Sequence, residues 1–271
     1  MRFPSAPALF AALAASTCLA APIGTREEIV TRLRAQLPGV PVAEYALGAA
    51  AFDTDLREQV AQNAAAADPV VAEGKVLWNA RFKDGRSLAG CFPNGGRRVA
   101  ATYPQYDGKL KRVITLEMAI NQCLRSHGEA TYEPTDAATM GKVVAYMRSL
   151  SDGRKVAVRV PAAAQERFEQ GRRLYFSRIG QRNYACASCH LQNAGKRYGD
   201  LPLSPPVGQA THWPVIRDGR AVTLQVRMRQ CLESMGAAPF PAGSEELNHI
   251  EYFLTYLSND LPIKSNVWRN W

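Results

Sequence analysis

The arrangement of apolar and polar positions along the chain predicts a mainly α-helical protein. An alanine-rich region over residues 22–72 contains helical stretches at 26–36 and 54–66. Pro38 and Pro41 separate these stretches, because proline removes a backbone donor and cannot continue a helix. We interpret the region as an N-terminal helical extension that packs on the rest of the chain or on a partner subunit.

The remainder of the chain contains two related halves. Residues 115–124, TLEMAINQCL, resemble residues 223–232, TLQVRMRQCL, and residues 145–151 resemble 251–258 near the end of each half. Each half therefore predicts a first helix, a loop, a helix that carries a cysteine, and a closing helix.

The first helix of each half is expected to begin at a matching pair, Glu73-Gly74 and Gln170-Gly171. A linker is expected over 151–165, since glycine and proline occur there. The predicted domains are residues 21–157, which include the extension, and residues 158–271.

The loop of the second half contains Cys186-Ala-Ser-Cys189-His190. Two thiols at this spacing can each form a thioether to a porphyrin vinyl group, and the histidine after them can bind the iron as an axial ligand. A zinc site would need a second ligand pair at similar spacing, and the chain has no other C-x-x-C or H-x-x-H. A thioredoxin-like motif would follow a strand, whereas a helical pattern flanks this loop. The motif predicts one covalent haem c, and with the helix order it predicts a cytochrome c domain.

The corresponding loop of the first half has lost this chemistry. Leu88-Ala-Gly-Cys91-Phe92 replaces the haem motif, with leucine for the first thiol and phenylalanine for the histidine. Leucine cannot form a thioether, and phenylalanine has no lone pair for iron. We expect two cytochrome c-like domains in tandem, of which the first lacks haem.

The N-terminus has the pattern of an export signal. Arg2 precedes an apolar run at 8–15, and small residues allow cleavage after Ala20, so residues 1–20 are predicted to be a signal peptide. A short N-terminal core helix is the alternative. The run is too short to span a membrane, and we expect a periplasmic protein with no membrane span. The net charge of +9 favours anionic small molecules or acidic proteins, and nucleic acid is not expected in that compartment.

The chain has six cysteines, of which one lies in the predicted signal and two belong to the haem motif. Cys91 and Cys123 occupy positions that haem chemistry would bring close, and an oxidising compartment favours a disulfide between them. Two buried free thiols are the alternative. Cys231 then has no cysteine partner.

Cys231 is a candidate for the sixth position on the haem iron, since thiolate is a known axial ligand. Met228 and Met235 flank this cysteine, and His212 and His249 are further candidates that spacing alone does not exclude. A buried cysteine that acts as a small apolar residue is the simpler alternative.

Arg227 precedes Cys231 by four positions, so the two side chains share a face of the predicted helix. Arg229 should point elsewhere. Because a guanidinium forms paired hydrogen bonds to oxyanions, Arg227 is a candidate to bind an anionic substrate. A solvated basic helix face is the alternative.

These features together resemble the SoxA family, the larger subunits of the SoxAX cytochromes of bacterial sulfur oxidation. The resemblance rests on the repeat, the haem motif, Arg227-x-x-x-Cys231 and the exported N-terminus. It implies the activity of an L-cysteine S-thiosulfotransferase, which joins thiosulfate to a cysteine of a SoxYZ carrier protein while electrons pass to haem. It also implies a SoxX-like cytochrome c partner, a Cys231 ligand modified to a persulfide, and the single-haem variant with a cystine in the first domain.

Two other functions fit the same residues. An electron-transfer cytochrome c subunit without chemistry of its own would use Met228 or Met235 as the ligand and would leave Arg227 on the surface. A thiosulfate dehydrogenase would also use cysteine-ligated haem but would need no carrier protein.

Overall fold

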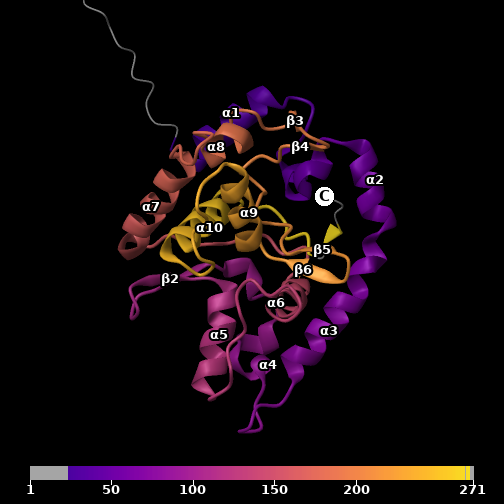
Figure 1. Ribbon diagram of the computed structural model, residues 1–271, viewed down its shortest axis with the longest axis vertical. Helices are drawn as coiled ribbons and strands as arrows, with labels where there is room; N and C mark the ends of the chain where they lie inside the picture. The colour runs from indigo at the N-terminus through magenta and orange to yellow at the C-terminus, as the bar shows by residue number, and fades with distance from the viewer. Residues whose placement is uncertain (1–23, 266, 269–271) are drawn as a thin grey trace, which may run out of the picture.

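The computed structural model describes residues 24–265 and 267–268, which form an N-terminal segment followed by two helical halves (Figure 1). The predicted signal peptide, residues 1–20, lies outside the described residues. In Figure 1 the first half occupies the lower part of the molecule, the second half lies above it, and the N-terminal segment runs along one side. The secondary structure is mainly helical, as the sequence predicts.

The N-terminal segment comprises α1 (Arg26–Gln36), the 3-10 helix η1 (Val42–Ala51), α2 (Thr54–Gln62) and the 3-10 helix η2 (Ala64–Ala67). α1 begins after Thr25, whose hydroxyl accepts the Glu28 N–H at 3.2 Å, while the Glu28 carboxylate accepts the Thr25 N–H at 3.0 Å. This reciprocal cap satisfies two backbone donors that the helix itself leaves unpaired. The first expected helix coincides with α1, and the second is divided into α2 and η2.

The N-terminal segment packs on the second half. The Thr211 hydroxyl donates to the Ala46 carbonyl at 2.9 Å, and the Gln36 side-chain amide donates to the Ala194 carbonyl at 3.1 Å. α1 buries Ile29 in the same apolar core as the second half. The segment therefore covers one side of the second half and reaches the site described below.

The two halves repeat one order of elements. The first contains α3 (Asp68–Asn79), α4 (Leu88–Cys91), η3 (Pro93–Gly96), η4 (Ala100–Thr102), β1 (Gln105–Asp107), β2 (Arg112–Ile114), α5 (Leu116–Ser126) and α6 (Met140–Ser149). The second contains η5 (Ala162–Ala164), α7 (Gln165–Phe176), α8 (Cys186–His190), β5 (Val215–Arg217), β6 (Arg220–Val222), α9 (Leu224–Ser234) and α10 (Glu245–Leu257). It adds the hairpin of β3 (Arg197–Tyr198) and β4 (Leu201–Pro202), and β7 (Val267–Trp268), which pairs in parallel with β5.

A glycine brings the first and last helices of each half into backbone contact. A Cβ on Gly171 of α7 would lie 2.0 Å from the His249 carbonyl oxygen of α10, and one on Gly74 of α3 would lie 2.1 Å from the Lys142 carbonyl oxygen of α6. Only glycine allows so close an approach. The expectation that these glycines begin their helices is wrong, because α3 and α7 start well before them and the glycines serve the crossing instead.

Each half has its own apolar core. In the first half Leu88 is fully buried, and the Phe92 ring lies 5.1 Å from the Trp78 ring, centroid to centroid. The two residues that replace haem-motif positions therefore fill space inside the fold. The core of the second half is larger and includes Tyr175 and Phe253, whose ring centroids are 5.5 Å apart.

Buried contacts join the two halves. A Cβ on Gly141 of α6 would lie 2.0 Å from the Ala221 carbonyl oxygen of β6. Nearby, the buried Arg148 guanidinium donates to the Ala210 and Thr211 carbonyls at 2.9 and 2.8 Å. A charged group at this depth is costly unless it is hydrogen-bonded, so Arg148 ties α6 to the loop that precedes β5.

The helix crossing of the second half predicts a large effect of Gly171→Ala. We expect the free energy of unfolding to fall by about 3 kcal/mol, because the new methyl group must displace the α10 backbone. Urea denaturation followed by far-UV circular dichroism measures the loss. Gly90→Ala is the matched control, since a Cβ there meets no atom within 4 Å. Equal denaturation midpoints for the two variants would show that the crossing does not limit stability.

Candidate functional site

A cavity of about 1000 Å³ lies in the second half, between α7, α8, α9, α10 and the N-terminal segment. Its walls include all five residues that the sequence selects for this half: Cys186, Cys189, His190, Arg227 and Cys231. The structure thus brings the motif on α8 and the Arg-x-x-x-Cys element on α9 to one cavity.

α8 is one helical turn whose start is fixed by a local hydrogen bond. The Ala185 N–H donates to the Ser188 hydroxyl oxygen at 3.0 Å, and Ser188 is buried. Residues three apart share a helix face, so Cys186 and Cys189 both line the cavity. His190 follows at the end of the same turn.

The His190 ring is oriented by two residues of the cavity wall, Ser204 and Gln209. Its Nδ1 lies 2.7 Å from the Ser204 carbonyl oxygen, and the Gln209 side-chain amide is 3.2 Å from the same nitrogen. Donation to a carbonyl requires the proton on Nδ1, which leaves the Nε2 lone pair available to a metal. Burial lowers the pKa of His190, and the Arg227 charge adds to this effect against the Ser204 hydrogen bond. The imidazole is therefore held neutral, as an iron ligand must be.

The Cys231 thiol lines the same cavity as the thiols of α8 and influences their titration. Burial raises the pKa of the Cys186 thiol to about 12, and the negative charge of a Cys231 thiolate is the next cause. Burial also raises the pKa of the Cys189 thiol, and the negative charge of a Cys231 thiolate is again the second cause. The effect of burial reflects the apolar walls of the cavity, and the effect of Cys231 reflects the gathering of the three thiols in it.

The alternative iron ligands divide into two groups. Met228 and Met235 line the same cavity as Cys231, whereas His212 and His249 are absent from its lining among the described residues. His249 instead lies in the helix crossing opposite Gly171. The geometry therefore retains three sulfur candidates, of which Met228 and Cys231 lie on α9 and Met235 caps its C-terminus, and it disfavours both histidines.

The two arginines of α9 point in different directions. Arg227 lines the cavity, is partly buried, and donates to the Gln230 side chain at 3.5 Å. Arg229 donates to the Phe240 carbonyl at 3.1 Å and is not among the described residues that line the cavity. Of this pair, Arg227 is the one that can meet a molecule inside.

The rim of the cavity contains charged residues that the sequence analysis did not identify. Arg182 and Arg197 line it, as does Asp53 of the N-terminal segment, whose carboxylate pairs with Arg197 at 2.6 Å. Asp53 also accepts the Leu56 N–H at 2.9 Å and so begins α2. The Lys196-Arg197 pair soon after the haem motif was a usable signal in the sequence, but the contribution of Asp53 depends on a contact between residues 144 positions apart.

The residues present fit a c-type haem. The cavity has the size and the apolar walls of a cofactor pocket. Two thiols on one helical turn and a neutral imidazole with a fixed tautomer meet in it, and a further sulfur comes from α9. This donor set is the one that covalent haem attachment requires.

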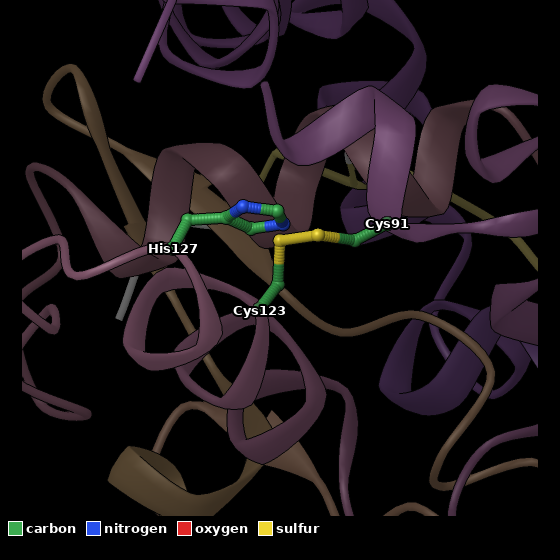
Figure 2. Close-up of side chains that lie close together, drawn as sticks. All are labelled: Cys91, Cys123 and His127. Atoms are coloured by element: carbon green, nitrogen blue, oxygen red, sulfur yellow. A yellow bond between two sulfur atoms is a disulfide. The ribbon is translucent and has the colours of Figure 1, made fainter. Parts of the chain in front are cut away.

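The first half holds a disulfide where the second half holds these thiols. Cys91 of α4 and Cys123 of α5 are bonded, with their Cα atoms 6.0 Å apart (Figure 2). Cys186, Cys189 and Cys231 are free. Among the described residues, no helix combines the length and apolar character needed to cross a membrane.

Comparisons with known proteins show which family the chain resembles. A family model described as SoxA/TsdA, cytochrome c domain, matches residues 73–156, the half without the haem motif. The L-cysteine S-thiosulfotransferase subunit SoxA of Chlorobaculum thiosulfatiphilum is 39% identical over 231 residues, which are 83% of this chain and 80% of that protein. The SoxA subunit of Allochromatium vinosum is 36% identical over 235 residues, or 84% and 83% of the two chains.

A solved structure supports the same relationship. SoxXA from P. pantotrophus superposes with a TM-score of 0.71 at 26% identity, over 80% of this chain and 84% of that one. The sequence relationship covers most of both chains, and the fold agrees over nearly the same extent. The chain therefore belongs to the SoxA family.

Proposed function

We propose that the chain is the SoxA subunit of a periplasmic L-cysteine S-thiosulfotransferase, which joins thiosulfate to a cysteine of a SoxYZ-type carrier protein. The observation that carries the proposal is the meeting of Cys231, Arg227 and the Cys186-x-x-Cys189-His190 motif in one cavity. Relatives that are 36–39% identical bear this activity in their names.

The proposed chain has a signal peptide over 1–20 and two cytochrome c-like domains in tandem, 21–157 and 158–271, with one haem in the second. The repeated order of elements and the repeated glycine crossing support two domains. The buried Leu88 and Phe92 and the Cys91–Cys123 disulfide support a first domain without haem, because they occupy the positions of its thioethers and axial ligand.

Cys186 and Cys189 would hold the haem covalently, and His190 would bind the iron through Nε2. Cys231, carried as a persulfide, would be the second residue to bind the iron. When bound, the haem supplies a one-electron acceptor next to the reacting sulfur. A SoxX-like cytochrome c subunit is the proposed partner, and the structural similarity to SoxXA supports it.

Arg227 would position thiosulfate. Thiosulfate is a dianion, and a guanidinium can donate two hydrogen bonds to its oxygens while offsetting its repulsion from a thiolate. Arg182 and Arg197 at the rim add positive charge along the approach, although the Asp53 carboxylate compensates Arg197.

The net reaction forms one sulfur–sulfur bond. The carrier thiol loses its proton, its sulfur joins the terminal sulfur of thiosulfate, and two electrons leave one at a time to the haem and on to the haem of the SoxX-like partner. The Cys231 sulfur is proposed as the relay, since it shares the cavity with Arg227 and lies on the same face of α9.

An electron-transfer cytochrome c remains the second candidate, because Met228 and Met235 line the same cavity. A thiosulfate dehydrogenase is distinguished by its independence from a carrier. Turnover of thiosulfate that requires the carrier protein supports the transferase, and turnover of thiosulfate alone supports the dehydrogenase.

The relay role predicts that Cys231→Ser lowers carrier-dependent thiosulfate turnover by about 100-fold or more. Haem content should stay at the wild-type level, because Cys186 and Cys189 are intact. Turnover is measured with the reconstituted partner subunit and carrier, and haem by pyridine haemochrome absorbance. Retention of full activity would exclude Cys231 from the chemistry.

The positioning role predicts that Arg227→Ala lowers kcat/KM for thiosulfate by about 10- to 100-fold, the range for one charge-assisted hydrogen-bond pair. Arg229→Ala is the matched control, since Arg229 faces the Phe240 carbonyl. Its kinetics should equal those of the wild type. Equal losses of activity in the two variants would show that general positive charge, and not the position of Arg227 in the cavity, determines the use of thiosulfate.

A further inference from the structure

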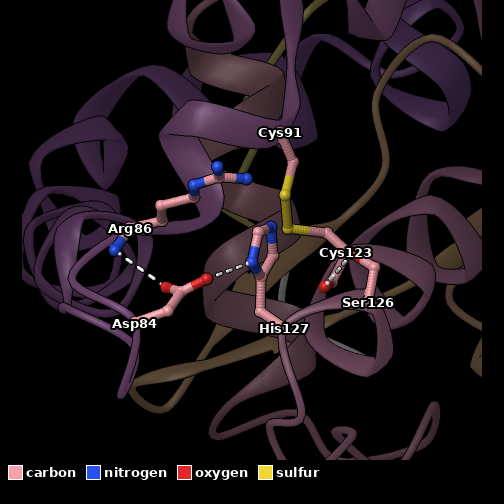
Figure 3. Close-up of a disulfide and its surroundings, with 6 residues drawn as sticks. All are labelled: Asp84, Arg86, Cys91, Cys123, Ser126 and His127. Carbon is pink, nitrogen blue, oxygen red and sulfur yellow. Dashed lines mark hydrogen bonds and ion pairs between the residues drawn. A yellow bond between two sulfur atoms is a disulfide. The ribbon is translucent and has the colours of Figure 1, made fainter.

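A histidine lies against the disulfide of the first half. One ring nitrogen of His127 and the sulfurs of Cys91 and Cys123 lie within 4.8 Å of one another (Figure 2). The ring is next to the Cys123 sulfur in both close-up views (Figures 2 and 3). Cysteine binds metal ions as a thiolate and not as a disulfide. In the oxidised chain these three residues are therefore placed for sulfur chemistry rather than for metal binding.

His127 is oriented by a carboxylate. Its Nδ1 lies 2.6 Å from the Asp84 Oδ2, and its ring stacks on Phe82 with the centroids 5.2 Å apart (Figure 3). The Arg86 backbone N–H lowers the pKa of Asp84 most, and the His127 hydrogen bond lowers it further. An ionised Asp84 accepts a hydrogen bond from the Nδ1–H of His127, and the other ring nitrogen, Nε2, then faces the disulfide (Figure 3).

The two sulfurs differ in accessibility. Cys91 is partly exposed at the surface, whereas Cys123 is 5% exposed. The His127 side chain is 12% exposed and the Asp84 side chain 41%. An incoming group can therefore reach Cys91, while the imidazole is shielded beside Cys123.

The acid–base pair is specific to the half with the disulfide. When α4 is aligned with α8, Asp84 corresponds to Arg182. When α5 is aligned with α9, His127 corresponds to Met235. A disulfide that only replaced the packing of a lost haem would need neither a histidine nor its carboxylate partner.

We propose that the Cys91–Cys123 disulfide is a thiol–disulfide exchange site for a protein dithiol, with His127 as its catalytic acid–base group and Asp84 as the residue that positions it. This activity is separate from the proposed thiosulfate chemistry and does not depend on it.

The exchange proceeds in two steps, in which the disulfide bond passes from the chain to the dithiol. A thiolate of the dithiol attacks Cys91 Sγ, a mixed disulfide forms, and the Cys91–Cys123 bond breaks with its electron pair on Cys123 Sγ. A proton on the His127 Nε2, taken from the attacking thiol, stabilises this leaving thiolate and can pass to it. The second thiolate of the partner then releases Cys91, so that the partner becomes a disulfide and the chain gains two electrons and two protons. Stabilising the leaving thiolate raises the rate of exchange.

The test uses the full-length holoprotein in its oxidised state, with dithiothreitol as the dithiol probe. Samples are alkylated at intervals, and peptide mass spectrometry gives the fraction of Cys91 and Cys123 that has been reduced. We expect His127→Gln to be reduced about 10-fold more slowly than the wild type, because the leaving thiolate loses its cationic partner. Asp84→Asn should be slowed by a smaller factor.

Glu129→Gln is the matched control, because this carboxylate accepts the Lys83 N–H at 2.8 Å in the same loop without touching His127. It should keep the wild-type rate. Added imidazole should restore the rate of His127→Ala, which a purely structural role for the ring would not allow. If His127→Gln fails to fold, Asp84→Asn on its exposed loop carries the test. Equal reduction rates in wild type, Asp84→Asn and Glu129→Gln, or reduction that requires unfolding in urea, would overturn the proposal.

Discussion

The approach of α7 to α10 at Gly171 is the constraint on which the second half depends. With the two backbones in contact, the loop after α7 delivers α8 to one side of the cavity, and α9, which precedes α10, delivers Cys231 and Arg227 to the other. The thiols of Cys186 and Cys189 and the imidazole come from α8, and the Cys231 thiol and the guanidinium come from α9. Their meeting is a consequence of the crossing that holds the longer helices.

A matching helix crossing occurs at Gly74 in the first half, but the interior next to that crossing is filled by side chains. In the first half Leu88 and Phe92 fill the core and the remaining sulfurs are bonded to each other. In the second half the equivalent positions are polar or reactive, and a cavity of about 1000 Å³ remains. The same order of elements thus supports a filled half and an open half, and a few side chains around α4 and α8 set the difference.

The sequence predicted the helical class, the position of α1 and the residues that gather in the cavity, because motif spacing and helix periodicity are local properties. It did not predict the place of Gly74 and Gly171, which is decided by the partner helix. Asp53 at the rim and Asp84 beside His127 were missed for the same reason, since each meets its partner through tertiary packing. All three sulfur candidates, Cys231, Met228 and Met235, line the cavity. The choice of iron ligand among them is therefore made on chemical grounds and not on position.

Iron-edge X-ray absorption on the haem-loaded protein tests the central claim, which is that the Cys231 sulfur faces the iron opposite His190. The account predicts one sulfur neighbour of the iron in the wild type, absent from Cys231→Ser and retained in Met228→Leu and Met235→Leu. A sulfur neighbour that persists in Cys231→Ser and disappears in either methionine variant would contradict it.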